Sequence, residues 1–330
     1  MSERRPLVTL YLSERCNSRC VTCDYWRHGG ADMSLEAVRR LLPSLEALGT
    51  RVVLISGGEP LLNAEWREIA ALLGSRGLRL WLLTSGLALA KHARAAAELF
   101  AAVTVSLDGT CPETYAAVRG LDAFDKVCAG IRAVADAGLP AGLRVTLQRA
   151  NYRELPRFVT LARELGAAYV SFLAVDVSNA HAFARRGASS AAPALASEDL
   201  PLLDERLAAL EREHAEDFAS GFIAESPEKL RRIRAYFAAL CGQGPFPPVR
   251  CNAPEFSAVV GADGRVAPCF FIPGPADAPR APRLADAVAS EPMRALTAAI
   301  RAGERPECAR CVCSMWRDPA TFTHEAFPHA

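Results

Sequence analysis

The chain has 330 residues, of which 51% are hydrophobic, and its 38 basic and 37 acidic residues give a net charge of +1. This length suffices for one large domain and a smaller one. Because the charges balance, nothing in the composition favours nucleic acid or a membrane surface as a partner, and we expect neither.

Six apolar runs are predicted to be β-strands. The first, at 7–12, is rich in β-branched and aromatic residues and too short for a signal sequence or a membrane span. The other runs lie at 51–56, 79–83, 102–107, 142–148 and 168–175. Helical patterns separate them, at 35–45 (after a capping Ser34), 64–75, 88–100, 123–137 and 155–165.

The strands are apolar without alternation, which indicates a parallel sheet covered by helices on its outer face. Six βα units are too few for a closed eight-fold barrel, so the predicted fold class is α/β, a partial (β/α)6 barrel. Ligands bind beyond the carboxyl ends of such strands. We expect four loops to converge there: the cysteine loop at 16–23, Gly57-Gly58-Glu59-Pro60, Thr84-Ser85-Gly86 and Ser106-Leu107-Asp108-Gly109.

The pattern changes after the sixth strand. Residues 180–197 are small and polar, as in a loop or mobile lid, and amphipathic helices are predicted at 198–216 and 227–240. A Gly- and Pro-rich linker at 242–248 leads to two short strands around Asp263-Gly264, a hairpin signal, and then to a helix at 291–301. We expect a core domain at 1–180, a helical extension and linker at 181–245, and a small β-hairpin/helix domain at 246–330.

Three cysteines, Cys16, Cys20 and Cys23, follow the first strand at spacings of three and two residues. Three thiolates on one loop can hold three corners of a metal centre and leave a fourth corner open for chemistry. A structural zinc site needs four ligands, and a disulfide would leave one cysteine over. The motif therefore favours an iron–sulfur cluster over zinc. In a cytoplasmic protein, which we expect here, the chain's 11 cysteines are more typical of metal ligands or buried thiols than of disulfides.

The cysteine motif after strand one, together with Gly57-Gly58-Glu59-Pro60 after strand two, resembles the radical S-adenosylmethionine (radical SAM) superfamily. Ser106-Leu107-Asp108-Gly109 and Val118-Arg119-Gly120 extend the resemblance over about residues 7–175, while Thr22 replaces an aromatic residue often found there. The resemblance implies a [4Fe-4S] cluster on Cys16, Cys20 and Cys23. It also implies SAM on the open iron, cleavage of SAM to a 5′-deoxyadenosyl radical, and a low-potential electron donor such as flavodoxin or ferredoxin.

The resemblance also assigns the SAM-binding residues. Gly57 and Gly58 would let backbone approach the ligand closely, and Glu59 would orient the SAM ammonium group. Thr84, Ser106 and Gln148 end strands where the carboxylate and ribose should lie, and Tyr25 would contact adenine. Without the cysteines, residues 57–60 would instead read as an ordinary turn between a strand and a helix.

A second group of cysteines resembles the SPASM and twitch auxiliary-cluster domains. Cys251, Gly264 and Cys269 match the opening of such a domain, and Cys308 and Cys311 would complete four ligands of a second [4Fe-4S] cluster. Only Cys313 then remains, which favours the shorter, twitch-like version with one cluster. A structural zinc site made from the same four residues is the alternative.

Cys313 and Arg144 are the candidate catalytic residues. Three roles are open for Cys313: it replaces Cys311 as a ligand, it donates a hydrogen atom to a substrate radical, or it is a small buried residue. The last role is the one expected for Cys111, Cys128 and Cys241. Arg144 lies on a strand that should end near the site, as a substrate base, as a carboxylate partner or as a surface arginine.

The overall pattern resembles radical SAM dehydrogenases of antibiotic biosynthesis, of the 2-deoxy-scyllo-inosamine dehydrogenase type. It implies an oxidoreductase that removes a hydrogen atom and a proton and passes one electron to the auxiliary cluster. Because the first strand begins at Leu7, we expect no preceding peptide-recognition domain and therefore a small substrate such as a sugar or aminocyclitol. The alternatives are a peptide (RiPP) maturase forming a crosslink or thioether, an epimerase using Cys313, and a non-catalytic iron–sulfur or zinc protein, against which Gly57-Gly58-Glu59-Pro60 argues.

Overall fold

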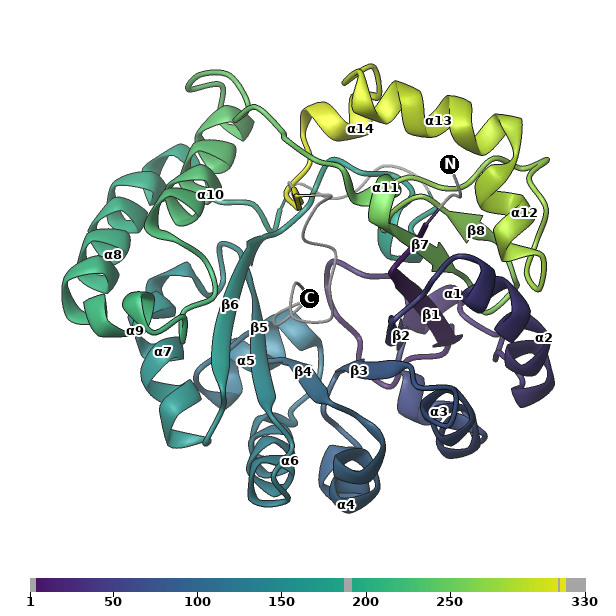
Figure 1. Ribbon diagram of the computed structural model, residues 1–330. Helices are drawn as coiled ribbons and strands as arrows, with labels where there is room; N and C mark the ends of the chain where they lie inside the picture. The colour runs from purple at the N-terminus through teal and green to yellow at the C-terminus, as the bar shows by residue number, and fades with distance from the viewer. Residues whose placement is uncertain (1–3, 187–191, 314, 319–330) are drawn as a thin grey trace.

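A single curved sheet with helices on its outer face forms the body of the molecule (Figure 1). The computed structural model describes residues 4–186, 192–313 and 315–318. Eight strands follow in chain order: β1 (Leu7–Ser13), β2 (Val52–Gly57), β3 (Arg79–Thr84), β4 (Ala102–Ser106), β5 (Ala141–Leu147), β6 (Tyr169–Ala174), β7 (Ser257–Val260) and β8 (Val266–Ala267). Their order in the sheet is β6-β5-β4-β3-β2-β1-β7-β8, and every neighbouring pair is parallel except β7–β8. The predicted α/β class with a parallel, partial-barrel sheet is confirmed.

Helices connect the first six strands, and the longer ones cover the outside of the sheet. They are α1 (Tyr25–His28), α2 (Leu35–Ala47), η1 (Pro60–Leu62), α3 (Trp66–Gly74), α4 (Leu89–Leu99), α5 (Pro112–Arg119), α6 (Phe124–Asp136), η2 (Tyr152–Glu154) and α7 (Leu155–Glu164). The later helices are η3 (Ala182–Ala184), η4 (Ser197–Asp199), α8 (Leu200–Glu213), α9 (Ala215–Ala219), α10 (Pro227–Leu240), α11 (Ala253–Phe256), α12 (Leu284–Ala289), α13 (Glu291–Arg301) and α14 (Pro306–Ala309). Within the described ranges, none of these helices has the length and apolar character needed to cross a membrane.

The helix α2 illustrates how local sequence specifies these elements. The Ser34 side chain accepts a hydrogen bond from the Ala37 N–H at 3.1 Å and so satisfies one of the free donors at the helix start. Val38, Leu41 and Leu45 recur at helical spacing and are buried against the sheet. The capped helix predicted here is confirmed.

Two helical regions differ from the prediction. The helix expected over 198–216 is divided, because His214 leaves helical geometry (φ −124°, ψ 31°) and its Nδ1 lies 2.8 Å from the Asp217 carboxylate. The helix α5 was not predicted. Pro112 occupies its first turn, where a missing N–H costs nothing, and Gly120 ends it in the left-handed conformation.

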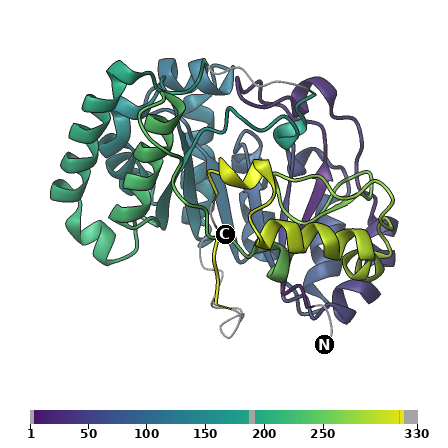
Figure 2. The ribbon, with the colours of Figure 1, turned by 90° about the horizontal axis from the view of Figure 1, so that it is seen from above.

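The C-terminal hairpin extends the barrel sheet. The predicted hairpin is confirmed as β7 and β8, and β7 also pairs in parallel with β1, with Leu7 opposite Ser257. The loop that leaves β1 therefore lies between the end of β2 and the hairpin. The helices α12 and α13 lie on this side of the molecule, and α8 and α10 lie at the far edge (Figure 2). The domain boundaries expected at 180 and 245 stay predictions.

Candidate active site

The cysteine loop (residues 16–23) is held on one side by the end of α5. The Arg19 N–H donates to the Arg119 carbonyl at 3.0 Å, and the Val21 N–H donates to the Val118 carbonyl at 3.1 Å. These carbonyls belong to the last turn of a helix, where they have no partner within the helix. A Cβ atom at Gly120 would lie 2.2 Å from the Arg19 carbonyl oxygen, so only glycine allows this contact.

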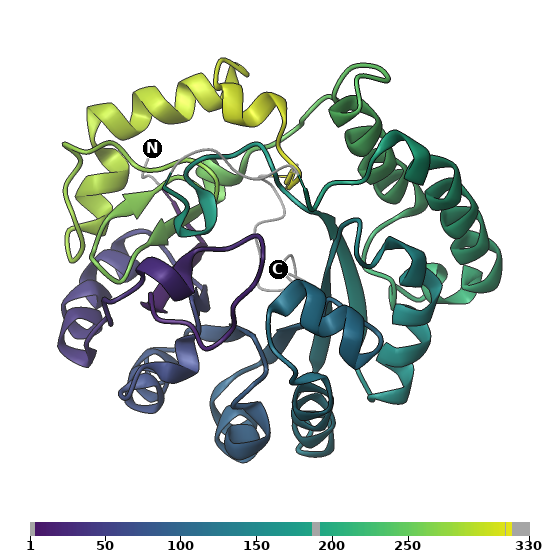
Figure 3. The same ribbon diagram turned by 180° about the vertical axis from the view of Figure 1, so that it is seen from behind.

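The segment after β6 holds the other side of the loop, and Figure 3 shows η3 of this segment beside it. The Asp24 N–H donates to the Phe183 carbonyl at 2.9 Å. The Arg185 guanidinium donates to the carbonyls of Thr22 at 2.9 Å and Asp176 at 2.7 Å. Arg185 is only 9% exposed, so it fastens the loop to the barrel from within the protein.

The Gly57-Gly58-Glu59 backbone continues the pairing of β2 with the chain that leads into the cysteine loop. The Gly58 N–H donates to Ser13 and the Glu59 N–H donates to Arg15, both at 2.8 Å. A Cβ atom at Gly57, which has φ +127°, would lie 2.3 Å from the Ser13 carbonyl oxygen, and one at Gly58 would lie 2.4 Å from that of Arg15. The sequence predicted that these two glycines let the backbone come close to a ligand. In the structure they let it come close to Ser13 and Arg15, which lead into the cysteine loop.

The Glu59 carboxylate is fully buried and hydrogen-bonded. It accepts from the Thr84 hydroxyl at 2.9 Å, from the Ser85 N–H and hydroxyl at 2.7 and 2.6 Å, and from the Leu61 N–H at 3.1 Å. The Ser85 hydroxyl also lies 3.2 Å from the Asn17 side-chain oxygen. Glu59 therefore ties the ends of β2 and β3 to the cysteine loop, and its direct contact with SAM stays a prediction.

Several buried polar atoms near these strand ends have no hydrogen-bond partner among the described residues. They are the Ser18 hydroxyl and the nitrogens Arg119 Nε, Arg144 Nε and Gln148 Nε2. Buried polar groups in proteins are nearly always paired, so each of these unpaired groups is available to a polar ligand. Ser106 ends β4 directly opposite Arg144 in the β4–β5 register, which brings both predicted residues to this region.

Arg119 is a residue whose role the sequence did not reveal. Its guanidinium lies 3.2 Å from the Asp108 carboxylate, and the two side chains are 12% and 4% exposed. Burial raises the pKa of Asp108, and Arg119 opposes that rise. Arg119 also interacts electrostatically with Cys16 and Cys20, so it supplies positive charge beside the loop. The only sequence signal was its place in the Val118-Arg119-Gly120 stretch.

The second cysteine set (Cys251, Cys269, Cys308 and Cys311) comes together from three separate segments. Cys269 and Cys308 each interact electrostatically with both Cys251 and Cys311. Burial raises the pKa of Cys269 to about 12 and that of Cys308 to about 11, which is opposite to the low pKa of a reactive catalytic thiol. Cys313 also lies in this group, since it interacts with Cys251 and Cys311.

A recurring backbone feature marks the predicted ligands. In five of the seven, the N–H two residues further along the chain donates to the cysteine sulfur: Ser18 to Cys16 at 3.5 Å, Ala253 to Cys251 at 3.5 Å, Cys313 to Cys311 at 3.4 Å, Tyr25 to Cys23 and Phe271 to Cys269. Hydrogen bonds to sulfur tune iron–sulfur clusters. The feature differs at Cys241, whose thiol donates to the Leu195 carbonyl, and at Cys111, whose thiol pairs with the Thr114 hydroxyl.

In the described part of the chain, no three His, Cys, Asp or Glu side chains lie close enough to hold a single metal ion. A four-iron cluster spaces its cysteines more widely, because each cysteine binds a different iron. Between the two sets lies Tyr11, which interacts electrostatically with Cys23 and with Cys269. Its ring meets that of Tyr25 edge to face at 6.0 Å, so Tyr25 lies beside the loop, while its contact with adenine stays a prediction.

The segment after β6 also connects the cysteine loop with the second cysteine set, as Tyr11 does. The Asn179 side-chain nitrogen donates to the Phe271 carbonyl at 2.7 Å, and the rings of Phe183 and Phe271 meet edge to face at 5.9 Å. Since Phe183 also contacts Asp24 and Phe271 follows Cys269 closely, one short segment supports both groups of cysteines.

Comparison with known proteins agrees with this geometry. Residues 10–162 match the family model described as the radical SAM superfamily. The chain is 32% identical over 169 residues to the Fe-coproporphyrin III synthase of Methanosarcina barkeri, a match that covers 49% of this chain and 42% of that protein. The chain spans about half the length of the curated relatives it matches.

Solved structures share the fold over nearly the whole chain. Streptococcus suis SuiB bound to S-adenosylmethionine has a TM-score of 0.67 at 14% identity, with 94% of this chain and 72% of that chain covered. The structure of anSMEcpe with bound AdoMet and a peptide has a TM-score of 0.66 at 19% identity, with 95% and 92% covered. At these identities the likeness concerns the fold.

Proposed function

We propose that this chain is a radical SAM oxidoreductase, which removes a hydrogen atom from its substrate. The observation that carries the proposal is the anchoring of the cysteine loop to the Gly57-Gly58-Glu59 backbone and to the end of α5. In the proposed enzyme Cys16, Cys20 and Cys23 hold a [4Fe-4S] cluster. When bound and reduced, by a flavodoxin or ferredoxin, this cluster would supply the electron that splits SAM into methionine and a 5′-deoxyadenosyl radical.

The chain's own residues would prepare this site in two ways. Glu59 holds Thr84 and Ser85 in place, while the unpaired Gln148 Nε2 and Ser18 hydroxyl are available for polar groups of SAM. Arg119 places a positive charge beside Cys20, where it offsets the negative charge of thiolate ligands.

The second cysteine set would hold an auxiliary [4Fe-4S] cluster. Loss of a hydrogen atom, a proton and an electron oxidises a substrate by two electrons in all, and the auxiliary cluster would accept that electron. Backbone N–H groups on Cys251, Cys269 and Cys311 support an iron–sulfur site in preference to unmodified thiols. Arg144, with its Nε unpaired, is the proposed substrate contact on β5.

Two substrate classes follow from the sequence. A sugar or aminocyclitol, as in the dehydrogenases that the chain resembles, is the first proposal. A peptide, the alternative that the sequence left open, is the second. The similar anSMEcpe structure is described with a bound peptide, which is consistent with this second candidate.

The proposed function is tested by anaerobic reconstitution with iron and sulfide, followed by SAM and dithionite. The wild-type chain should form 5′-deoxyadenosine, and the triple variant Cys16→Ala/Cys20→Ala/Cys23→Ala should form none. The matched control Cys111→Ala/Cys128→Ala/Cys241→Ala removes three other thiols and should keep the activity. Formation of 5′-deoxyadenosine by the first triple variant would contradict the assignment of the cysteine loop.

A further inference from the structure

Asn252, which directly follows Cys251, connects the second cysteine set with the residues that come after its last member. The Asn252 N–H donates to the Met315 carbonyl at 3.0 Å. The side-chain amide of Asn252 donates to the Arg317 carbonyl at 2.7 Å and accepts from the Arg317 N–H at 2.9 Å, the double exchange that two paired strands make. Asn252 is only 2% exposed. Residues 315–317, which we call the strap, are thereby held beside Cys251.

The strap lies on the concave side of the sheet. Met315 packs against a hydrophobic cluster that contains Leu54 of β2 and Trp81 of β3. The neighbours of Leu54, Val53 and Ile55, belong instead to the larger core that contains the buried residues of α2 and α3. Because side chains alternate along a strand, Leu54 faces the inside of the barrel. The strap is therefore anchored to the inner face of the sheet.

A second contact joins the same two segments. The Arg250 guanidinium lies 3.9 Å from the centre of the Trp316 ring, which is a cation–π contact. The residues before and after Cys251, Arg250 and Asn252, thus both contact the strap. The position of Cys251 is therefore tied to the position of residues 315–317.

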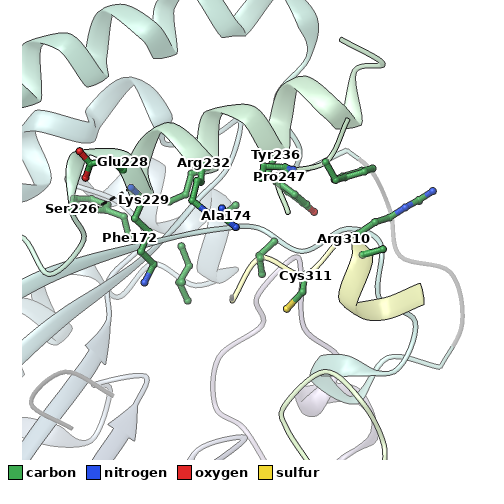
Figure 4. Close-up of a pocket in the computed structure, with 15 residues that line it drawn as sticks. Phe172, Ala174, Ser226, Glu228, Lys229, Arg232, Tyr236, Pro247, Arg310 and Cys311 are labelled. Atoms are coloured by element: carbon green, nitrogen blue, oxygen red, sulfur yellow. Dashed lines mark hydrogen bonds between the residues drawn. The ribbon is translucent and has the colours of Figure 1, made fainter. Parts of the chain in front are cut away.

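The segment at 308–313, which carries the other cysteines of this region, borders a cavity of about 260 Å³ on its α10 side. Figure 4 shows Cys311 and Arg310 at this cavity, with Tyr236 of α10 among the residues that line it. The Arg310 guanidinium lies 5.2 Å from the centre of the Phe246 ring. Atoms that line a cavity lose packing contacts on that side, so packing against α10 holds the segment only weakly.

Hydrogen bonds within the segment determine its shape. The Cys308 N–H donates to the Arg305 carbonyl at 3.0 Å, the Cys311 N–H donates to the Cys308 carbonyl at 3.1 Å, and the Cys313 N–H donates to the Cys311 sulfur at 3.4 Å. Such local bonds do not determine where the segment lies relative to Cys251. The long-range bonds that do so follow directly, in the strap.

We infer that Asn252 is a positioning residue of the second cysteine set: it holds the strap, and through the strap it holds the segment at 308–313 beside Cys251. The Arg250–Trp316 contact supports it in this role. Cysteines that already lie in place lose less conformational entropy when a cluster binds. The inference rests on the proposed function, because it concerns how the chain prepares the site of the auxiliary cluster.

The test uses the full chain with the changes Cys16→Ala/Cys20→Ala/Cys23→Ala, which remove the ligands of the cysteine loop. After anaerobic reconstitution this background should contain about four irons, all in the second cysteine set. Adding Asn252→Ala should remove about half of them or more. The EPR spectrum of the remaining cluster, reduced with dithionite, should differ from that of the background, because the ligands are no longer held in the same positions.

The matched control in this background is Asn63→Ala. Asn63 is also 2% exposed, and its side chain also makes three hydrogen bonds with backbone groups, those of Leu12, Met33 and Glu65. It should keep the four irons and their spectrum. Equal iron loss in both variants would reduce the effect to general destabilisation and overturn the inference. An unchanged iron content and spectrum in Asn252→Ala would overturn it as well.

Two further measurements keep the test decisive. Hydrogen exchange before reconstitution reads the strap directly, since the Arg317 amide donates to Asn252 and should exchange at least tenfold faster in Asn252→Ala. If Asn252→Ala does not fold, Trp316→Ala replaces it. The Trp316 side chain is 47% exposed, so its loss should leave the fold intact. Trp316→Ala should lose part of the iron, and full iron loading in that variant would then overturn the inference.

Failure of this inference and failure of the proposed function give different results in the same background. Absence of iron from the background itself overturns the auxiliary cluster, and the exchange rate of the Arg317 amide then still decides whether Asn252 holds the strap. Four irons in both the background and Asn252→Ala, with the same spectrum, overturn only the positioning role.

Discussion

Gly120 ends α5 in the left-handed conformation and lies against Arg19 so closely that a Cβ atom would stand 2.2 Å from the Arg19 carbonyl oxygen. The contact joins the end of a helix to the middle of the cysteine loop, where Arg19 lies between Cys16 and Cys20. The short helix α5 thus helps to determine the position of the cysteine loop at the end of the barrel.

Replacement of Gly120 by alanine should displace this loop. The variant Gly120→Ala should lose most of the iron bound by Cys16, Cys20 and Cys23 and most 5′-deoxyadenosine formation, as measured by iron analysis and chromatography. The matched control is Gly138→Ala, which also has positive φ but has nothing within 4 Å of a Cβ atom. Both changes incur about 1–2 kcal/mol of left-handed strain, so a similar iron loss in both variants would contradict the steric argument.

The choice between Cys311 and Cys313 as auxiliary ligand is also testable. The Cys313 N–H donates to the Cys311 sulfur, the same backbone feature found at Cys16 and Cys251. Of about eight irons expected for two [4Fe-4S] clusters, Cys311→Ser should lose about four and Cys313→Ser should lose none. The reverse pattern would make Cys313 the ligand, and no loss in either variant would contradict the auxiliary cluster.

The carboxylate of Glu59 should be needed for the geometry of the strand ends. In Glu59→Gln an amide nitrogen replaces one acceptor oxygen, which leaves a buried donor of Thr84 or Ser85 unpaired. This should cost about 1–3 kcal/mol, visible as a lower thermal midpoint, and should raise the KM for SAM in 5′-deoxyadenosine formation. Glu65→Gln, an exposed carboxylate on the same side of the barrel, is the control. An unchanged KM and midpoint in Glu59→Gln would remove its positioning role.

Asp199 should make stability depend on pH at the junction of α7 and α8. Burial alone would raise the pKa of Asp199, but the Ala196 N–H, the Tyr152 hydroxyl and two guanidinium groups together lower it. A lowered pKa stabilises the fold above the unfolded value of about 3.9. That contribution is lost as pH falls through the folded pKa.

The variant Asp199→Asn should therefore have a lower thermal midpoint than the wild type at pH 6–7, and the difference should shrink below pH 4. Circular dichroism over this range measures it. Glu198→Gln is the neighbouring control, because Glu198 is exposed and its pair with Arg149 should contribute no more than about 1 kcal/mol. A difference in thermal midpoint between Asp199→Asn and wild type that stays constant with pH would contradict the stabilising role of the ionised Asp199 carboxylate.

Local patterns predicted most of the elements because periodicity and capping act within a few residues. The apolar runs became strands, and Ser34 began a helix as expected. The short helix α5 escaped prediction because Cys111-Pro112-Glu113 resembles a turn as much as a helix start. The break at His214 escaped as well, since neither glycine nor proline marks it.

The sequence by itself predicted which cysteines carry the chemistry, because ligand type and spacing along one loop are local properties. It also determined the parallel α/β sheet, through the order of apolar strands and amphipathic helices. Only the tertiary structure decided that β7 pairs with β1 and that Arg119 lies beside the cysteine loop. These relationships join residues far apart in the chain, and they depend on strand order and long-range backbone hydrogen bonds that no local pattern encodes.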